Sequence, residues 1–182
     1  MGTYFERTAI TVYPGTGGFR ATRAITPEVA VVADEEPEAA PMRISPHLCF
    51  DGQCAEAFRH YHHVLGGRIA TMLTYGESPL AAQTPPEYHN RIVHATLELD
   101  GVELTGVDVP PREYRRPQGF FVTLTAADEA DAQRCFLSLS DGGTVLMPYQ
   151  ETFWSAGFGV LIDRFGIPWE INCAQSPRQP ST

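Results

Sequence analysis

The stretch RIVHATLELDGVELTGVD, residues 91–108, has the clearest local pattern in the chain. Apolar and polar side chains alternate on both sides of the Asp-Gly pair at 100–101, and this arrangement is a strong signal for a tight β-hairpin. The pattern therefore predicts two antiparallel strands with one apolar face and one polar face. On the polar face the register sets these residues opposite one another: Glu98 and Glu103, Thr96 and Thr105, His94 and Val107.

The segments before the hairpin predict a strand, a helix and a second strand. Residues 44–50 alternate in polarity, and residues 54–67 repeat apolar side chains at helical spacing before a Gly-Gly stop. Residues 68–75 again favour a strand. A loop rich in proline, glycine and serine follows at 76–90 and is long enough to form a lid or rim.

The same order returns in the second half of the chain. The pattern predicts a strand at 120–125, a helix at 127–143 and three further strands up to residue 172. Two βαβββ modules of similar length predict an α+β fold, in which the modules form a cupped, mostly antiparallel sheet with the helices outside.

The predicted domain boundaries follow this repeat. We expect the first module at about 44–114 and the second at about 119–174, within one domain at 44–174. Residues 1–43 are rich in glycine, proline and clustered acids, and predict a poorly ordered extension. Residues 175–182 are expected to form a C-terminal tail.

The composition argues against two classes of binding partner. The net charge of −9 argues against nucleic acid and against an anionic membrane surface, both of which need a basic protein face. No apolar run is long enough to span a bilayer, and we see no secretory signal. The four cysteines form no C-x-x-C pair, which favours free thiols in the cytoplasm.

Polar residues of the predicted strands fall on a common face. Such a face lines a ligand or metal site if it is concave, or else it simply faces water. Glu98 opposite Glu103 sharpens the choice, because like charges across a hairpin need full solvation, a shared proton or a cation. The face contains Ser45, His47, Cys49, His94, Thr96, Glu98, Glu103, Thr105, Phe121, Thr123, Thr125, Glu170 and Asn172.

Two histidines are the candidate bases or ligands. His94 shares the polar face with carboxylates, so it is either a hydrogen-bonded structural residue or a metal ligand or general base. His47 on the first strand is a similar candidate with weaker support. His60, His62 and His63 lie on the predicted helix away from its apolar face, which favours a solvated surface.

The segment QETFWSAGFGVLIDRFGIPWEIN at 150–172, together with ISPHLCFDGQCAEAFRHYHHVLGG at 44–67, resembles the vicinal oxygen chelate superfamily. More narrowly, it looks like the PhnB-like branch of these glyoxalase and bleomycin-resistance relatives. The resemblance implies a homodimer, and in metal-dependent members a divalent ion held by two histidines and two glutamates. The glutamate positions fall on Glu103 and Glu170, whereas the histidine positions fall on Ser45 and about Phe121.

The resemblance leaves three functions open. The first is a lyase, isomerase or dioxygenase using zinc, nickel, manganese or iron, with Glu103 and Glu170 as ligands and His47 or His94 as third ligand or base. The second is a non-catalytic dimer that binds a small aromatic or cationic molecule. The pocket residues expected for that function are Phe121, Thr96, Trp154 and Phe153. The third is a structural or regulatory dimer. Some PhnB-like sequences are labelled demethylubiquinone methyltransferases, but no Gly-rich strand–helix turn suited to a nucleotide is present.

Overall fold

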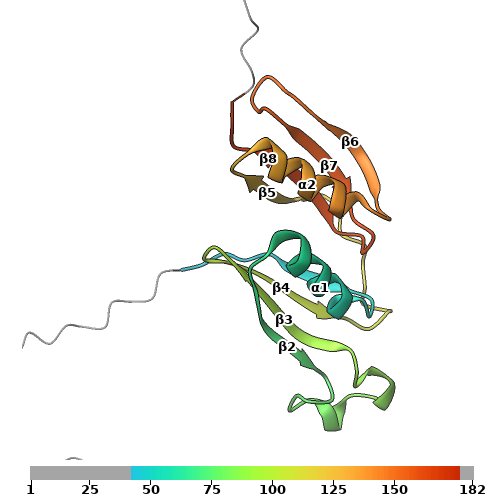
Figure 1. Ribbon diagram of the computed structural model, residues 1–182. Helices are drawn as coiled ribbons and strands as arrows, with labels where there is room; N and C mark the ends of the chain where they lie inside the picture. The colour runs from blue at the N-terminus through green and yellow to red at the C-terminus, as the bar shows by residue number, and fades with distance from the viewer. Residues whose placement is uncertain (1–41, 177–182) are drawn as a thin grey trace, which may run out of the picture. The chain divides into compact units, whose positions relative to one another are not determined.

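The computed structural model describes residues 42–176, in which two βαβββ modules follow one another along the chain (Figure 1). Nearly all of the predicted extension at 1–43 and most of the tail at 175–182 lie outside the described residues. The α+β class and the paired modules predicted from the sequence are confirmed.

The first module contains one helix and a four-stranded sheet. Its strand order is β1-β4-β3-β2, with β1 parallel to β4 and the other neighbours antiparallel. Two short 3-10 turns, Ala81–Gln83 and Pro86–Tyr88, lie in the loop that the sequence predicted at 76–90. The main elements are β1 (His47–Phe50), α1 (Cys54–Leu65), β2 (Arg68–Thr74), β3 (Ile92–Leu99) and β4 (Val102–Asp108).

The second module repeats this topology. Its strand order is β5-β8-β7-β6, with β5 parallel to β8 and the other neighbours antiparallel. The hydrogen bonds thus form two four-stranded sheets, one for each module. The elements are β5 (Val122–Ala126), α2 (Glu129–Ser140), β6 (Thr144–Gln150), β7 (Phe158–Ile162) and β8 (Pro168–Cys173).

The hairpin that joins β3 to β4 has the predicted register. Glu98 lies opposite Glu103, and Thr96 lies opposite Thr105. Asp100 has φ of 47° and the next residue, Gly101, has φ of 82°, so both turn residues adopt the left-handed conformation of a type I′ turn. The Asp-Gly pair is therefore the local cause of the register.

Each helix covers one face of its own sheet, and a glycine marks that face. A Cβ atom at Gly106 of β4 would lie 2.5 Å from the ring of Phe58 on α1. In the second module a Cβ atom at Gly159 of β7 would lie 2.6 Å from the ring of Phe136 on α2. Absence of a side chain lets each ring lie directly on the sheet. The opposite face of each sheet is called the open face below.

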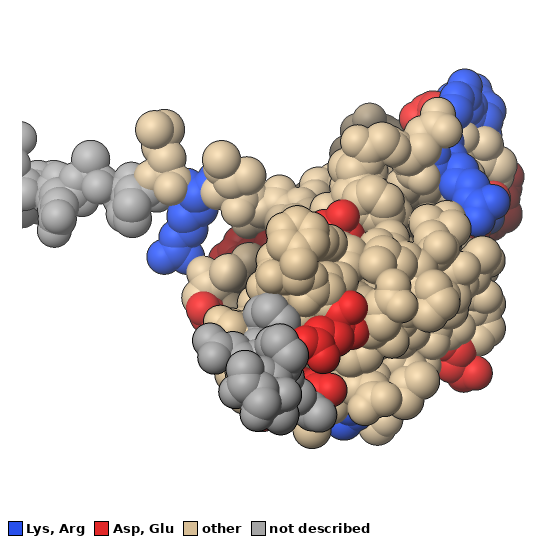
Figure 2. Space-filling view, turned by 90° about the horizontal axis from the view of Figure 1, so that it is seen from above, with Lys and Arg blue, Asp and Glu red and all other residues tan. Residues whose placement is uncertain are grey.

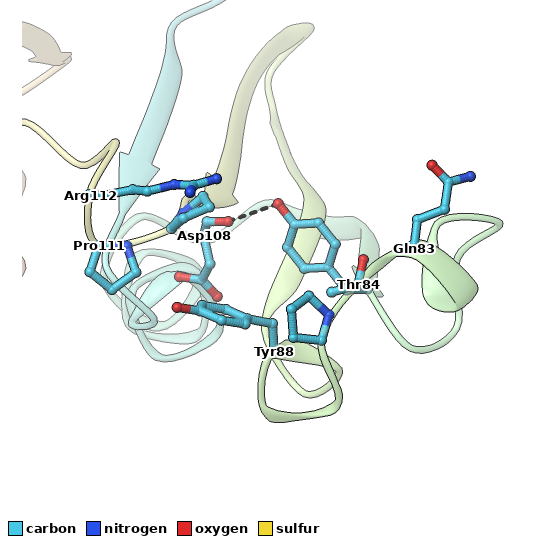
Figure 3. A pocket seen from close by; sticks show the side chains of 9 residues that line it. Gln83, Thr84, Tyr88, Asp108, Pro111 and Arg112 are labelled. Atoms are coloured by element: carbon cyan, nitrogen blue, oxygen red, sulfur yellow. Dashed lines mark hydrogen bonds between the residues drawn. The ribbon is translucent and has the colours of Figure 1, made fainter.

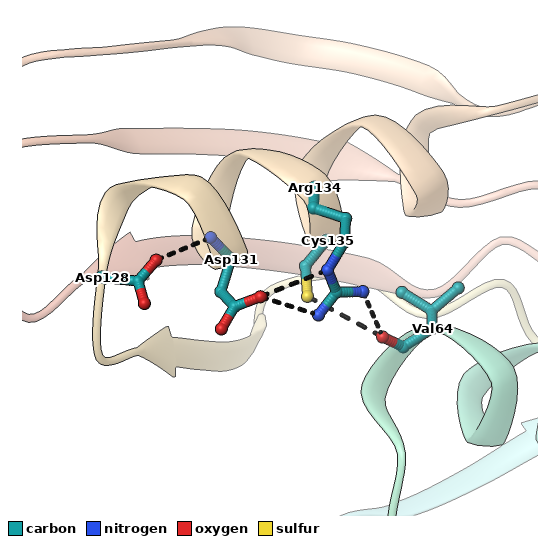
Figure 4. Close-up of polar contacts among 5 residues, drawn as sticks. All are labelled: Val64, Asp128, Asp131, Arg134 and Cys135. Carbon is teal, nitrogen blue, oxygen red and sulfur yellow. Dashed lines mark hydrogen bonds and ion pairs between the residues drawn. The ribbon is translucent and has the colours of Figure 1, made fainter.

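The two helices begin in different ways. Asp128 caps α2 from the preceding residue, and its carboxylate accepts a hydrogen bond from the Asp131 amide at 2.9 Å (Figure 4). Gln53 makes no such side-chain bond at α1. Instead the buried Asp108 at the end of β4 accepts from the Cys54 amide at 2.9 Å, so a distant strand satisfies the first turn of α1.

Contacts near the helices join the two modules. Arg134 on α2 donates to the carbonyl of Val64 in the last turn of α1 at 2.8 Å, and Asp131 accepts from the same guanidinium (Figure 4). Cationic groups are favourable at a helix C-terminus, where carbonyls lack intrahelical partners. Asp163, which follows β7 and is 3% exposed, accepts from Tyr61 of α1 at 2.6 Å.

Candidate functional site

The open face of the first module contains the predicted histidines in hydrogen-bonded positions. The Nδ1 atom of His47 lies 2.8 Å from the Thr105 hydroxyl oxygen. The Nε2 atom of His94 lies 3.1 Å from the Thr96 hydroxyl oxygen. Both side chains thus interact with threonines on the sheet, which fits the structural alternative that the sequence left open for them.

The glutamate pair of the hairpin has a partner that the sequence did not identify. Arg68 on β2 donates to the Glu98 carboxylate at 2.7 Å. Because the two residues are 30 positions apart and paired in the β2–β3 register, the contact follows from the sheet and has no local signal. The Arg68 guanidinium thus offsets the repulsion between Glu98 and Glu103. Pairing with an arginine is a fourth solution, beside the full solvation, shared proton or bound cation expected from the sequence.

The open face of the second module contains one acid beside aromatic side chains. Glu170 on β8 accepts a hydrogen bond from the Thr123 hydroxyl on β5 at 3.2 Å. Phe158 on β7 lies directly opposite Asn172 on β8, and the Asn172 Oδ1 atom is buried with no hydrogen-bond partner among the described residues. A buried acceptor without a partner is costly, and an enclosed water would offset that cost.

Three aromatic rings are in contact at the N-terminal end of β7. The ring centroids of Phe153 and Trp154 are 4.5 Å apart, and those of Trp154 and Phe158 are 5.5 Å apart, both in edge-to-face geometry. Phe153 is 89% exposed and Trp154 is 49% exposed. These three residues form the aromatic cluster. Of the predicted pocket residues, Phe153 and Trp154 therefore lie together.

Two other residues of the predicted site line a different cavity. Glu103 and Phe121 line a cavity of about 200 Å³, together with Thr123 and apolar side chains of both modules. Ser45 lines a separate hollow with Glu103. Phe121 is 43% exposed and lies one residue before β5 begins.

The donors expected for the metal site do not come together in one chain. Among the residues that the structure describes, no three His, Cys, Asp or Glu side chains form a group that could hold a metal ion. His47 is hydrogen-bonded to Thr105, and Glu170 accepts from Thr123. The donor set of one chain therefore does not fit the metal centre that the superfamily resemblance implies, and we derive no metal-dependent step.

A larger cavity, of about 510 Å³, lies in the first module and contains none of the predicted residues (Figure 3). The sequence predicted a lid or rim at 76–90, but it gave no signal for the residues from the end of β4 and the following loop that complete the cavity. The lining residues are Tyr75, Gln83, Thr84, Pro85, Tyr88, Asp108, Pro110, Pro111 and Arg112.

The surface has charges of both signs. In the view of Figure 2, both acidic and basic side chains are scattered over a mostly uncharged surface. Within the described part of the chain, no helix is long and apolar enough to cross a membrane.

The fold and the sequence agree with a known family. The profile of the family described as 3-demethylubiquinone-9 3-methyltransferase matches residues 42–172. Protein YjdN of Escherichia coli (strain K12) is 33% identical over 147 residues, which cover 76% of this chain and 100% of YjdN. The chain belongs to this PhnB-like family and has the vicinal oxygen chelate fold.

Two solved structures are similar to this chain. Protein PA1353 from Pseudomonas aeruginosa is 39% identical with a TM-score of 0.69, and the match covers 75% of this chain and 100% of PA1353. A PhnB protein from Bacillus cereus is 25% identical with a TM-score of 0.64, and the match covers 73% of this chain and 100% of that one.

Proposed function

We propose that this protein binds a small aromatic cation, without catalysis, on the open face of the second module. The aromatic cluster of Phe153, Trp154 and Phe158 carries this proposal, because large exposed aromatic rings in mutual contact are unusual on a protein surface without a partner. A planar cation gains both stacking and cation–π attraction on such rings.

Polar groups beside the cluster support a cation rather than an anion. Glu170 lies on the open face, one strand from Val160, and supplies a carboxylate. Asn172 lies directly opposite Phe158, and its buried Oδ1 acceptor has no partner within residues 42–176. The charge of a cationic ligand on the cluster would face the Glu170 carboxylate.

We further propose that the working form is a cytoplasmic homodimer. The superfamily resemblance implies a dimer, and Phe158, Val160 and Ile162 on the open face of β7 stay only half-buried in one chain. A second copy would cover these side chains and enclose the ligand. The four free cysteines support a reducing compartment. Light scattering after size exclusion tests the dimer, with a monomer mass contradicting it.

Two catalytic alternatives have less support. A metal-dependent enzyme would use Glu103 and Glu170 with His94 or His47, but the donors of one chain do not converge. The family description names a methyl transfer, yet the strand–helix turns before α1 and α2 have no glycine-rich loop for a nucleotide-type methyl donor. Metal analysis of the untagged protein tests the first alternative, since stoichiometric zinc, nickel, manganese or iron would support an enzyme.

The binding proposal is tested with 10-methylacridinium, a planar aromatic cation that quenches tryptophan. The chain has two tryptophans, of which Trp154 is 49% exposed and Trp169 is 2% exposed. We expect saturable quenching in the native protein and its loss in Trp154→Phe. We also expect Glu170→Gln to weaken binding by about two- to fivefold, as for a partly exposed charge pair, whereas the exposed Glu56→Gln serves as a matched control.

The contrary results are specific. Quenching that does not saturate, or that is the same in Trp154→Phe, would place the cation away from the aromatic cluster. If Glu170→Gln and Glu56→Gln weaken binding equally, Glu170 acts only through the net charge of the protein and does not contact the ligand.

A further inference from the structure

The 510 Å³ cavity of the first module has the features of a second binding site. It lies between the loop that contains Pro86–Tyr88 and the residues that follow β4, away from the aromatic cluster in the sequence and in its own module. Its volume falls within the range of about 300–1,000 Å³ that is usual for small-molecule pockets. The cavity therefore has room for a ligand of one or two fused rings with a polar substituent.

The walls of the cavity are aromatic and rigid. Tyr75 and Tyr88 supply two rings, and three prolines at 85, 110 and 111 supply apolar surface with little conformational freedom. The Tyr75 hydroxyl donates to the Asp108 carbonyl oxygen at 3.0 Å, which fixes one ring at the wall (Figure 3). Walls that are ordered in advance favour a flat ligand, because little entropy is lost on binding.

Two charged residues line the cavity, Asp108 and Arg112, and only Arg112 has donors free for an anionic ligand. Both carboxylate oxygens of Asp108 already accept backbone N–H groups, from Cys54 at 2.9 Å and from Ile92 at 2.8 Å. The side chain of Arg112, in contrast, is 85% exposed, and the only ion pair of its guanidinium among the described residues is with Glu113 at 3.4 Å. The buried acid is thus committed to the fold, while the arginine is available to a ligand.

A second arginine disfavours a cationic ligand here. The guanidinium of Arg91 lies 4.7 Å from the centre of the Tyr88 ring and already makes a cation–π contact with it. A ligand cation would therefore compete with Arg91 for the ring and would face Arg112 as well. An anionic ligand meets neither penalty.

We propose that this cavity binds a planar aromatic carboxylate, with its rings against Tyr75 and Tyr88 and its carboxylate on Arg112. Arginine presents a fork of N–H donors that matches a carboxylate. The site does not depend on the cation site of the second module, and it prefers the opposite ligand charge.

Calorimetric titration of the full chain with three matched probes tests the proposal: 2-naphthoate, the neutral 2-naphthamide and the cationic 2-naphthylmethylammonium. We expect 2-naphthoate to bind more tightly than the amide by about two- to fivefold, the range for an exposed charge pair, and the ammonium to bind least. Arg112→Gln is expected to remove the difference between acid and amide. Arg59→Gln removes one exposed positive charge from α1 and should preserve it.

Two further variants locate the ligand. Tyr88→Leu should weaken the acid and the amide alike, because it removes a ring of the wall, and thermal melting establishes that the variant is folded. Trp154→Phe should leave 2-naphthoate binding unchanged even if it abolishes acridinium binding. The proposal is overturned if 2-naphthoate shows no saturable binding up to millimolar concentration, if the amide or ammonium binds as tightly, if Arg112→Gln matches Arg59→Gln, or if Trp154→Phe removes binding.

Discussion

The two modules share one topology but differ in how their buried acids are used. In the first module Asp108 accepts from the amides of Cys54 and Ile92, so it fastens α1 and β3 of its own module. In the second module Asp163 accepts from Tyr61 of the first module and from Trp169 of its own. One acid therefore stabilises a module internally, whereas the other couples the two modules.

The open faces differ as well. That of the first module has His–Thr contacts and an Arg68–Glu98 pair. That of the second has a single hydrogen-bonded glutamate, exposed aromatic rings nearby and an asparagine oxygen that has no partner in the described part of the chain. A repeated framework thus presents a satisfied polar surface in one half and an unsatisfied, aromatic one in the other. This difference supports the proposal that a cation binds in the second module.

Asp163→Asn should produce the largest effect on stability. One carboxylate oxygen accepts from the Phe165 and Ile167 amides, and the other accepts from the Tyr61 hydroxyl and the Trp169 indole. An asparagine NH₂ in the second position would face donors, and the indole N–H cannot become an acceptor. We expect a loss of about 2–4 kcal/mol in the free energy of unfolding, measured by urea denaturation.

Tyr61→Phe is the control for the bond between the modules. It removes one donor and leaves the other three contacts of Asp163 in place, so we expect a smaller loss of about 1–2 kcal/mol. Burial, followed by the nearby charge of Asp163, raises the pKa of Tyr61, so its hydroxyl keeps the proton that it donates. Equal losses in the two variants would mean that Asp163 acts mainly through Tyr61 alone.

The helix caps provide the second test of how the two modules differ. Asp128→Ala removes the side-chain acceptor of α2, and a loss of this kind costs about 1 kcal/mol. Gln53→Ala at the equivalent position of α1 should have almost no effect, because Gln53 makes no capping bond and Asp108 supplies the acceptor. Urea denaturation measures both. A comparable loss in Gln53→Ala would show that the two helices begin alike after all.

These caps also illustrate how far the sequence could predict the fold. Asp128 caps α2 through the amide of Asp131, three residues along the chain, so this contact is of the kind that a local sequence pattern can indicate. Asp108 caps α1 from 54 residues away, which no spacing rule can detect. The hairpin at Asp100-Gly101 was predicted with its register because the turn residues themselves determine it.

The candidate site was less predictable for the same reason. Alternation correctly assigned Thr96, Thr105 and Glu170 to polar positions, since side chains alternate between faces along every strand. Contacts between strands, such as that of Arg68 with Glu98, depend on strand pairing, which the sequence pattern does not reveal. His60 was expected on a solvated helix surface and is instead partly buried against Phe165, which belongs to the loop before β8.

Substitution of His60 should change stability less than the substitutions at Asp163 and at the helix caps. It tests whether the contact of His60 with Phe165, which joins the modules, responds to pH. Burial, and then the positive charge of Arg164, lower the pKa of His60 below its ordinary value of 6.5, while Asp163 partly opposes them and His63 adds to the lowering. The unfolded chain therefore binds a proton more readily than the folded one. Stability contributed by neutral His60 is complete above pH 6.5 and declines as the pH falls through the lower pKa of the folded state.

We expect the free energy of unfolding to fall less steeply between pH 7 and pH 5 in His60→Gln than in the native protein. His62→Gln is the matched control, because His62 is exposed on the same helix and should leave the slope unchanged. Urea denaturation at half-unit steps of pH measures the three slopes. If His60→Gln and His62→Gln change the slope equally, the effect belongs to the general charge of α1, and the coupling between modules rests on Asp163 and Arg134 without a contribution from His60.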